Sequence, residues 1–393
     1  MTQPGNDNLS HLSEILNKLA KRGLGVLELE TERNALAAAS KSFNGAATTV
    51  ITRIAGALPD VTDHGSRWIM ARMLRDLGLK NEGDAETALK TLVTCFQSEK
   101  DAGTRAMACG QMRELAIAYE PLSGMAAAAI ALHLMAEKDD YSRNTQKNAL
   151  LSIGMAYEAA APTAVSFIGG LLATEKDPAS RMIIATNLQE IAAKYPSQAK
   201  AVIAQLSKTA ETETDKDAAR KYAQDIGMIG FTNPGATALS ITALSEGFKR
   251  GGEVETVAAW SHNLLLLGLS HPMAVIAEID GGMKNYDENQ RRMSAVNLTR
   301  IADIGKVEAT AASAVMIAAL KREESSYNRR LLVQGLMTSV RNKADEKPVL
   351  ELFKEEYKRE RDKETRELLD RSLRHLGFIT PVPVLVPLRP VNN

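Results

Sequence analysis

The sequence predicts an all-α fold, an α-solenoid of about ten helix pairs that repeat roughly every 38 residues. One observation is a recurring string, because Glu99-Lys100-Asp101 returns as Glu137-Lys138-Asp139 and as Glu175-Lys176-Asp177 at spacings of 38 residues. A second is that each copy holds two stretches whose apolar residues recur at helical spacing. A third is that no stretch alternates apolar and polar residues over the length of a strand.

Each copy divides into two amphipathic helices, and the third copy shows the plan. A first helix is expected over 163–174 and a second over 181–195, where the apolar residues fall on one face. Pro178 suits the first turn of the second helix, and Pro196 ends it. Because one pair cannot bury its apolar face alone, it must stack on its neighbours.

An aspartate opens the second helix of most copies, and an arginine follows about four residues later. An aspartate just before a helix can accept hydrogen bonds from free first-turn amides, and an arginine can reach a carboxylate in the next repeat. Periodic recurrence favours this structural interpretation over a set of solvated charges. The proposed ladder positions are Asp63, Arg67, Asp101, Arg105, Asp139, Arg143, Asp177, Arg181, Asp217, Arg220, Asp287, Arg291, Arg329, Asp362 and Arg366.

With these positions the chain resembles the HEAT-repeat family of armadillo-like solenoids over about residues 10–377. The resemblance implies that the aspartate braces the turn, that the arginine opens the second helix, and that the two form a ladder between repeats. It also implies that the second helices line the usual binding surface, and it identifies no function. The solvent-facing candidates for partner binding on those helices are Arg113, Glu114, Gln146, Lys147, Asn187, Glu190, Asn297 and Arg300.

The chain is expected to divide into five parts. Residues 1–60 are atypical capping repeats, 61–230 are regular repeats, 231–282 are irregular, glycine-rich repeats with a possible hinge, and 283–377 are further regular repeats. Residues 378–393 form an extended tail rich in proline and aliphatic residues. This tail either packs on its own chain or docks on a partner, and its candidate contacts are Ile379, Val382, Val384 and Val386.

The composition excludes several classes of partner and location. Lys+Arg and Asp+Glu both total 48, so there is no global attraction to nucleic acid. Cys95 and Cys109 are too few for a disulfide framework and are interpreted as small buried hydrophobes. Without an N-terminal apolar segment or a run of about 20 apolar residues, a cytoplasmic location and no membrane span are expected.

No motif for catalysis stands out in the sequence. Phosphate-binding loops, nucleophile elbows and histidine pairs at ligand spacing are missing, so no catalytic residue, cofactor or metal is expected. The leading hypothesis is a non-catalytic protein–protein interaction scaffold or adaptor subunit of a larger complex. The alternative is a glycosylase-type enzyme that binds nucleic acid, but aromatic residues make up only 4%, and Trp68 and Trp260 are interpreted as core.

Overall fold

The computed structural model describes residues 4–20, 26–42, 47–80 and 82–378, and these residues form α-helices and short 3-10 helices without any strand. The predicted all-α solenoid is confirmed. The helices of the first half are α1 (Pro4–Ala20), α2 (Val26–Ser42), α3 (Ala47–Ala57), α4 (His64–Gly78), α5 (Glu82–Ser98), α6 (Ala102–Ala118), α7 (Ser123–Leu134), α8 (Asp140–Ala156), α9 (Ala161–Leu172) and α10 (Pro178–Lys194). Those of the second half are α11 (Ala199–Ala210), α12 (Lys216–Thr232), α13 (Thr237–Arg250), α14 (Val254–Ser270), α15 (Pro272–Gly282), α16 (Glu288–Ala302), α17 (Lys306–Leu320), α18 (Ser326–Arg341), α19 (Glu346–Arg359) and α20 (Lys363–His375).

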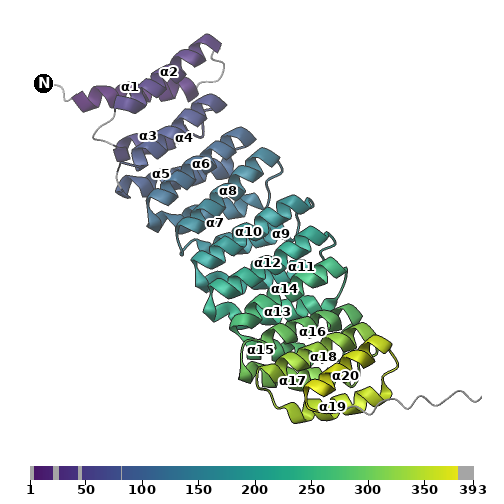
Figure 1. Cartoon of the computed structure of the whole chain (residues 1–393). Helices are drawn as coiled ribbons and strands as arrows, with labels where there is room; N and C mark the ends of the chain where they lie inside the picture. Colours follow the sequence, from purple (N-terminus) through teal and green to yellow (C-terminus); the bar gives the residue numbers. More distant parts are fainter. Residues whose placement is uncertain (1–3, 21–25, 43–46, 81, 379–393) are drawn as a thin grey trace, which may run out of the picture. The chain divides into compact units, whose positions relative to one another are not determined.

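The helices form two layers. Odd-numbered helices are the first members of their pairs and even-numbered helices are the second members, and consecutive members of each layer pack on one another, as α4, α6 and α8 do (Figure 1). Short 3-10 turns begin three of the pairs, η1 (Glu120–Leu122), η2 (Pro196–Gln198) and η3 (Pro234–Ala236). The chain forms two compact units, one of residues 4–176 with 183–202 and the other of 177–182 with 203–378.

The apolar periodicity places the core where the sequence predicts it. In the third copy α9 and α10 begin and end within three residues of the predicted helices. Ile184, Leu188 and Ile191 are all buried on one face of α10. Burying such a side chain completely stabilises the fold by about 1.5–3 kcal/mol, so stacking of the pairs is the main source of stability.

A small residue near the end of each second helix lets the next first helix approach closely. Positions 78, 116, 154, 192, 230 and 268, each 38 residues after the last, are all glycine or alanine. At Gly154 an added Cβ would lie 2.4 Å from Cβ of Ala164 in α9, well inside van der Waals contact. The packing distance between layers therefore depends on this position, which the sequence analysis did not single out.

The glycine-rich stretch retains its helix pairs. Gly251 and Gly252 end α13 with φ angles of +74° and +114°, a backbone region that glycine enters without strain. The hinge expected within 231–282 stays a prediction, as do the other domain boundaries. The candidate tail contacts Ile379, Val382, Val384 and Val386 lie outside the described residues.

Candidate functional site: a protein-binding face on the second helices

A ladder of arginine–glutamate pairs joins consecutive repeats. In each pair an arginine one turn into a second helix reaches a buried glutamate in the turn before the next second helix, about 32 residues later. The nitrogen–oxygen distances are 2.8 Å for Arg67–Glu99, 2.7 Å for Arg105–Glu137, 2.8 Å for Arg181–Glu213, 2.8 Å for Arg291–Glu323 and 2.8 Å for Arg329–Glu360. We call this set the arginine–glutamate ladder.

Glu137 shows how the glutamate braces its turn. Oε2 accepts hydrogen bonds from Arg105 Nε at 2.7 Å, Ser142 Oγ at 2.8 Å and Gln146 Nε2 at 2.9 Å. Oε1 accepts from Arg105 Nη2 at 2.7 Å and from the backbone amides of Lys138 and Asp139 at 3.0 and 3.1 Å. The Arg105 guanidinium, together with these donors, lowers the pKa of Glu137 to about 2. The pair is bidentate and buried, so it joins the repeats in one register.

The partners in this ladder differ from those expected from the sequence. The aspartates cap their own helices, as Asp101 does by accepting from the Thr104 amide at 2.7 Å and Asp139 by accepting from the Ser142 amide at 2.8 Å. Asp63, Asp287 and Asp362 make the equivalent first-turn bonds, and Asp177 accepts from the Ser180 amide. The carboxylate that arginine reaches belongs to the glutamate two residues earlier. That glutamate was visible as the first residue of the recurring Glu-Lys-Asp string.

The fourth copy was aligned two residues out of register. Asp215, not Asp217, caps α12, because its side chain accepts from the amides of Asp217 and Ala218. Arg220 is exposed and pairs only within its own helix, with Asp217 at 3.2 Å. The true ladder position, four residues after the cap, is Ala219. The repeat length there is 38, and the ladder lacks its arginine.

Two other ladder positions also stand apart from the pattern. Arg143 is half-buried at the equivalent position of α8, and no side-chain partner is found for it among the described residues. Arg366 follows the last pair, and its guanidinium lies 4.9 Å from the ring centroid of Tyr357.

A second series of contacts, from tyrosines, also recurs every 38 residues. The hydroxyl groups of Tyr119, Tyr157 and Tyr195 donate to backbone carbonyls near the end of the preceding second helix, at 3.1, 2.6 and 3.0 Å. These carbonyls would otherwise lack a partner, because the last turn of a helix leaves its acceptors free. The spacing of the tyrosines in the sequence was the available signal.

Two of the predicted partner-binding residues are buried and hold the fold together. Gln146 is fully buried and donates to Glu137, so it belongs to the ladder. Asn297 is 4% exposed and donates to the backbone carbonyl and hydroxyl of Ser261 at 3.0 Å. The expectation that these two face the solvent was wrong, because their helical positions point to the neighbouring repeat.

The remaining predicted residues lie at the surface of their helices. Glu114 accepts an ion pair from Arg75 at 2.6 Å and is 4.0 Å from Arg113. Glu190 and Arg300 are exposed, and Lys147 and Asn187 are partly exposed. Of these, only Arg300 lines a groove.

This groove runs over α14, α16 and α18. Its volume is about 330 Å³, and it is lined by Ala258, Ser261, His262, Leu265, Arg292, Met293, Val296, Asn297, Arg300, Tyr327 and Leu331. The lining holds two arginines and a histidine but no carboxylate. Arg292 and Arg300 make no ion pair with any residue in the described part of the chain. The groove therefore carries uncompensated positive charge beside the half-exposed ring of Tyr327.

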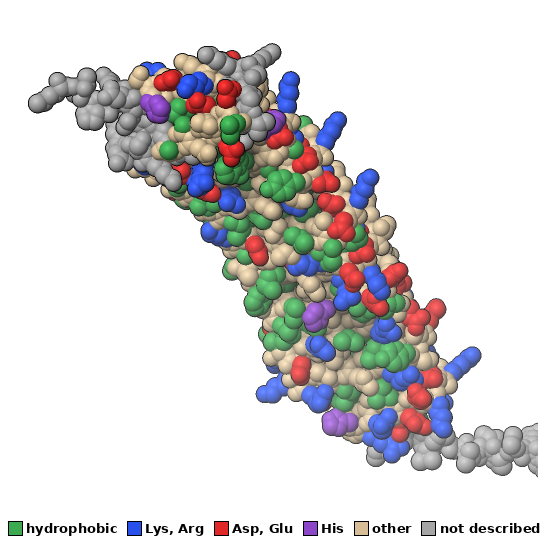
Figure 2. Space-filling model, turned by 90° about the horizontal axis from the view of Figure 1, so that it is seen from above, with side chains coloured by type: hydrophobic (Ala, Val, Ile, Leu, Met, Phe, Trp, Pro, Cys, Tyr) green, Lys and Arg blue, Asp and Glu red, His purple; other side chains and the backbone are tan. Residues whose placement is uncertain are grey.

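An exposed apolar row continues the groove along the second helices. Met228 and Phe231 on α12 precede Leu266 and Leu269 on α14 by 38 residues, so they occupy equivalent positions on adjacent helices. All four are between 44% and 67% exposed. In Figure 2 the repeats toward the C-terminal end present hydrophobic side chains among lysines and arginines. Exposed apolar side chains that adjoin in this way are typical of a protein-binding surface.

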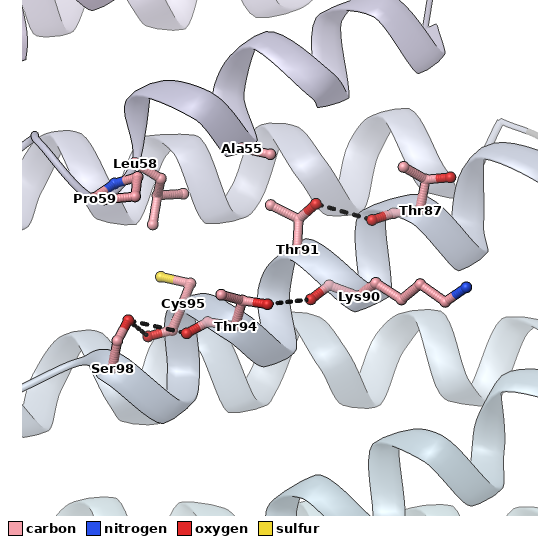
Figure 3. A pocket seen from close by; sticks show the side chains of 9 residues that line it. All are labelled: Ala55, Leu58, Pro59, Thr87, Lys90, Thr91, Thr94, Cys95 and Ser98. Atoms are coloured by element: carbon pink, nitrogen blue, oxygen red, sulfur yellow. Dashed lines mark hydrogen bonds between the residues drawn. The ribbon is translucent and has the colours of Figure 1, made fainter.

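A second cavity, between α3 and α5, offers little chemistry. It measures about 240 Å³, and Figure 3 shows Thr91, Thr94 and Ser98 on its α5 wall. Their hydroxyls donate to backbone carbonyls of their own helix at 2.9–3.1 Å, so they are already satisfied. Burial raises the pKa of the Cys95 thiol in this wall and raises that of Cys109 to about 12. Both thiols stay protonated at neutral pH and are weak nucleophiles.

No group of three or more metal-ligating side chains is found among the described residues. None of the helices between residues 4 and 378 is long and apolar enough to cross a membrane. Trp260 is buried as predicted, whereas Trp68 is 38% exposed.

The chain has likenesses among solved structures. No protein-family model and no curated protein matches it. An engineered protein matches with a TM-score of 0.40 and 16% identity over 95% of this chain and 100% of its own. Kap121p bound to RanGTP matches with a TM-score of 0.42 and 10% identity, over 91% of this chain and 41% of its own. A structure of tubulin recruitment by TOG domain arrays matches with a TM-score of 0.41 and 10% identity, over 95% and 98% of the two chains.

Proposed function

We propose that this protein is a non-catalytic interaction scaffold or adaptor subunit that binds a protein through the groove on α14, α16 and α18 and the adjoining apolar row. The observation that carries the proposal is the pair of unneutralised arginines, Arg292 and Arg300, beside contiguous exposed apolar side chains. Such a surface favours a partner segment that combines acidic and apolar residues, because charge and apolar area are then both complementary.

The expected energetics agree with a specific but moderate interaction. Burying the exposed parts of Phe231, Leu266 and Leu269 contributes about 1 kcal/mol each, since each is roughly half exposed. Each arginine that gains a carboxylate partner adds a charge-assisted hydrogen bond of about 1.5–3 kcal/mol. The tail residues Ile379, Val382, Val384 and Val386 are proposed as a second contact with the same or another partner.

Affinity capture followed by mass spectrometry tests this function. The wild-type chain is compared with an Arg292→Glu/Arg300→Glu variant and with a control, Lys306→Glu/Lys321→Glu, which reverses two exposed charges on the first helix α17 of the pair whose second helix is α18. We expect the first variant to lose a partner that the control retains, with unchanged melting temperatures. Equal capture by all three chains would contradict the proposed groove.

The alternative, a nucleic-acid enzyme of glycosylase type, is favoured by the basic groove and by Tyr327. Its chemistry needs a catalytic carboxylate, and the groove lining supplies none. Duplex DNA should therefore bind weakly, with an affinity that falls steeply as salt rises. Tight binding of DNA at physiological salt, lost in the Arg292→Glu/Arg300→Glu variant, would support the alternative instead.

A further inference from the structure

A cavity opens at the point where the arginine–glutamate ladder is interrupted. It measures about 400 Å³ and lies between the turn that precedes α12 and the turn that precedes α14. Ala219, which stands at the arginine position, and Gly251, which stands at the glutamate position 32 residues later, both line it. Two side chains that fill this space elsewhere in the fold are replaced here by a methyl group and a hydrogen atom.

Other repeats show what the equivalent space holds. There a guanidinium reaches the glutamate and also donates to carbonyls of its own turn, as Arg105 Nη1 does to Lys100 O at 2.6 Å and Arg329 Nη1 does to Glu323 O at 3.2 Å. Arg291 Nη1 makes the same contact with Tyr286 O at 2.8 Å. The turn therefore provides acceptors for a planar cation as part of the repeat.

The turn before α12 keeps this arrangement although its arginine is missing. Glu213 still accepts the amides of Thr214 and Asp215 at 2.9 and 2.8 Å, and Asp215 still caps α12. The equivalent carbonyls, five and six residues before Ala219, are those of Thr214 and Glu213. Within the described residues neither carbonyl accepts a hydrogen bond. Unpaired carbonyls at a cavity favour a hydrogen-bond donor as ligand.

Charge and an aromatic wall point to a cationic donor. The lining includes four carboxylates, from Glu211, Glu213, Asp215 and Glu253, against two cations. One cation, Lys216, is paired with Glu255 at 3.0 Å, and the other, Arg250, is exposed with its guanidinium 6.0 Å from the ring centroid of Trp260. Trp260 is 3% exposed and forms part of the wall, where an aromatic face attracts a cation.

We propose that this cavity is a binding site for a guanidinium group, such as the side chain of an arginine presented by a partner. The site is independent of the groove on α14, α16 and α18, because it lies at the turns and not on the exposed face of the second helices. The ligand would donate to the free turn carbonyls and pack against Trp260, in the place that the ladder arginine takes in the other repeats.

Tryptophan fluorescence gives a direct test, because the chain has only two tryptophans. In a Trp68→Phe background Trp260 is the sole reporter, and the protein is titrated with N-acetyl-arginine amide and with methylguanidinium. The matched control ligand is N-acetyl-citrulline amide, which has nearly the same shape without the charge. We expect saturable binding of the arginine amide, about tenfold or more tighter than that of the citrulline compound.

A protein variant supplies the second control. Ala219→Arg should place a guanidinium in the cavity from within and abolish binding of the added ligand, with a melting temperature equal to or above that of the wild type. Glu253→Gln, at the exposed rim, should weaken binding several-fold and covers the case in which Ala219→Arg does not fold. Binding of methylguanidinium as well would identify any guanidinium as ligand, whereas binding of the arginine amide alone would identify a peptide arginine. The proposal is overturned if neither compound binds by fluorescence or calorimetry, or if citrulline amide or the Ala219→Arg chain binds equally well.

Discussion

Replacing Glu137 by glutamine should lower the free energy of unfolding by about 3 kcal/mol at neutral pH. The side chain is only 2% exposed, and its carboxylate receives two hydrogen bonds from Arg105 as well as those from the turn. These donors lower the pKa from an ordinary 4.5 to about 2, and a difference of that size corresponds to about 3 kcal/mol of stability. Glutamine keeps the shape but turns an N–H donor toward the guanidinium.

The pH dependence of this effect has a definite sign. Because the folded pKa lies below the unfolded value, the stabilisation is fully present above pH 4.5 and is lost as the pH falls toward 2. By pH 3 about 2 of the roughly 3 kcal/mol should be gone. Urea denaturation of wild type and variant at pH 7 and pH 3 measures this, with Glu190→Gln on the exposed surface of α10 as control. The reasoning is refuted if the two chains differ by less than about 1 kcal/mol at pH 7, or if their difference does not shrink at pH 3.

Three further substitutions test the contacts between repeats. Arg105→Ala should cost about 2–4 kcal/mol in chemical denaturation because it leaves a buried carboxylate without its cation, whereas Arg143→Ala at the equivalent position should cost less than about 1 kcal/mol; equal losses would contradict the ladder. Gly154→Ala should lower stability by about 1–3 kcal/mol through contact with α9, and Gly110→Ala, which has open space around it, should raise stability by about 0.5–1 kcal/mol, so melting shifts of the same sign would count against the packing account. Tyr157→Phe removes one hydrogen bond to the preceding repeat and should cost about 1 kcal/mol; an unchanged melting temperature would show that the bond is not formed in solution.

The repeat and its helix pairs could be read from the sequence because both are periodic. Apolar spacing located α9 and α10 to within three residues, and the recurring aspartates marked helix starts such as those of α6 and α8. The fourth copy misled the alignment, because the Asp-Lys-Asp string at 215–217 offers two aspartates. Only the cap geometry shows that Asp215 is the equivalent of Asp177.

The contacts across repeats were harder to predict. Adjacent charges in a turn do not reveal which carboxylate faces the next arginine, and Glu137 wins because it is buried whereas Asp139 is used by its own helix. Polar residues on a second helix can face solvent or the neighbouring repeat, and a small error in helical phase decides between them. Gln146 and Asn297 were assigned to the wrong side for this reason.

The binding face could be located only in part. The rule that second helices carry the contact surface led to Arg300, which does line the groove on α14, α16 and α18. The apolar row was not found, because Phe231 and Leu269 look like ordinary core residues until their exposure is known. Position in the repeat gives the helix, and only the packed structure shows which of its apolar residues remain uncovered.

Site-specific photo-cross-linking tests the central proposal, binding of a protein at this face, most directly. A photoreactive residue is placed at Leu266, in the apolar row, and in a second chain at Val307, which is 64% exposed on the first helix α17. The account predicts that position 266 cross-links one defined protein in cells, that the Arg292→Glu/Arg300→Glu substitutions abolish the product, and that position 307 does not give it. Cross-linking of the same protein at 307 but not at 266, or a product at 266 that survives the charge reversal, would contradict it.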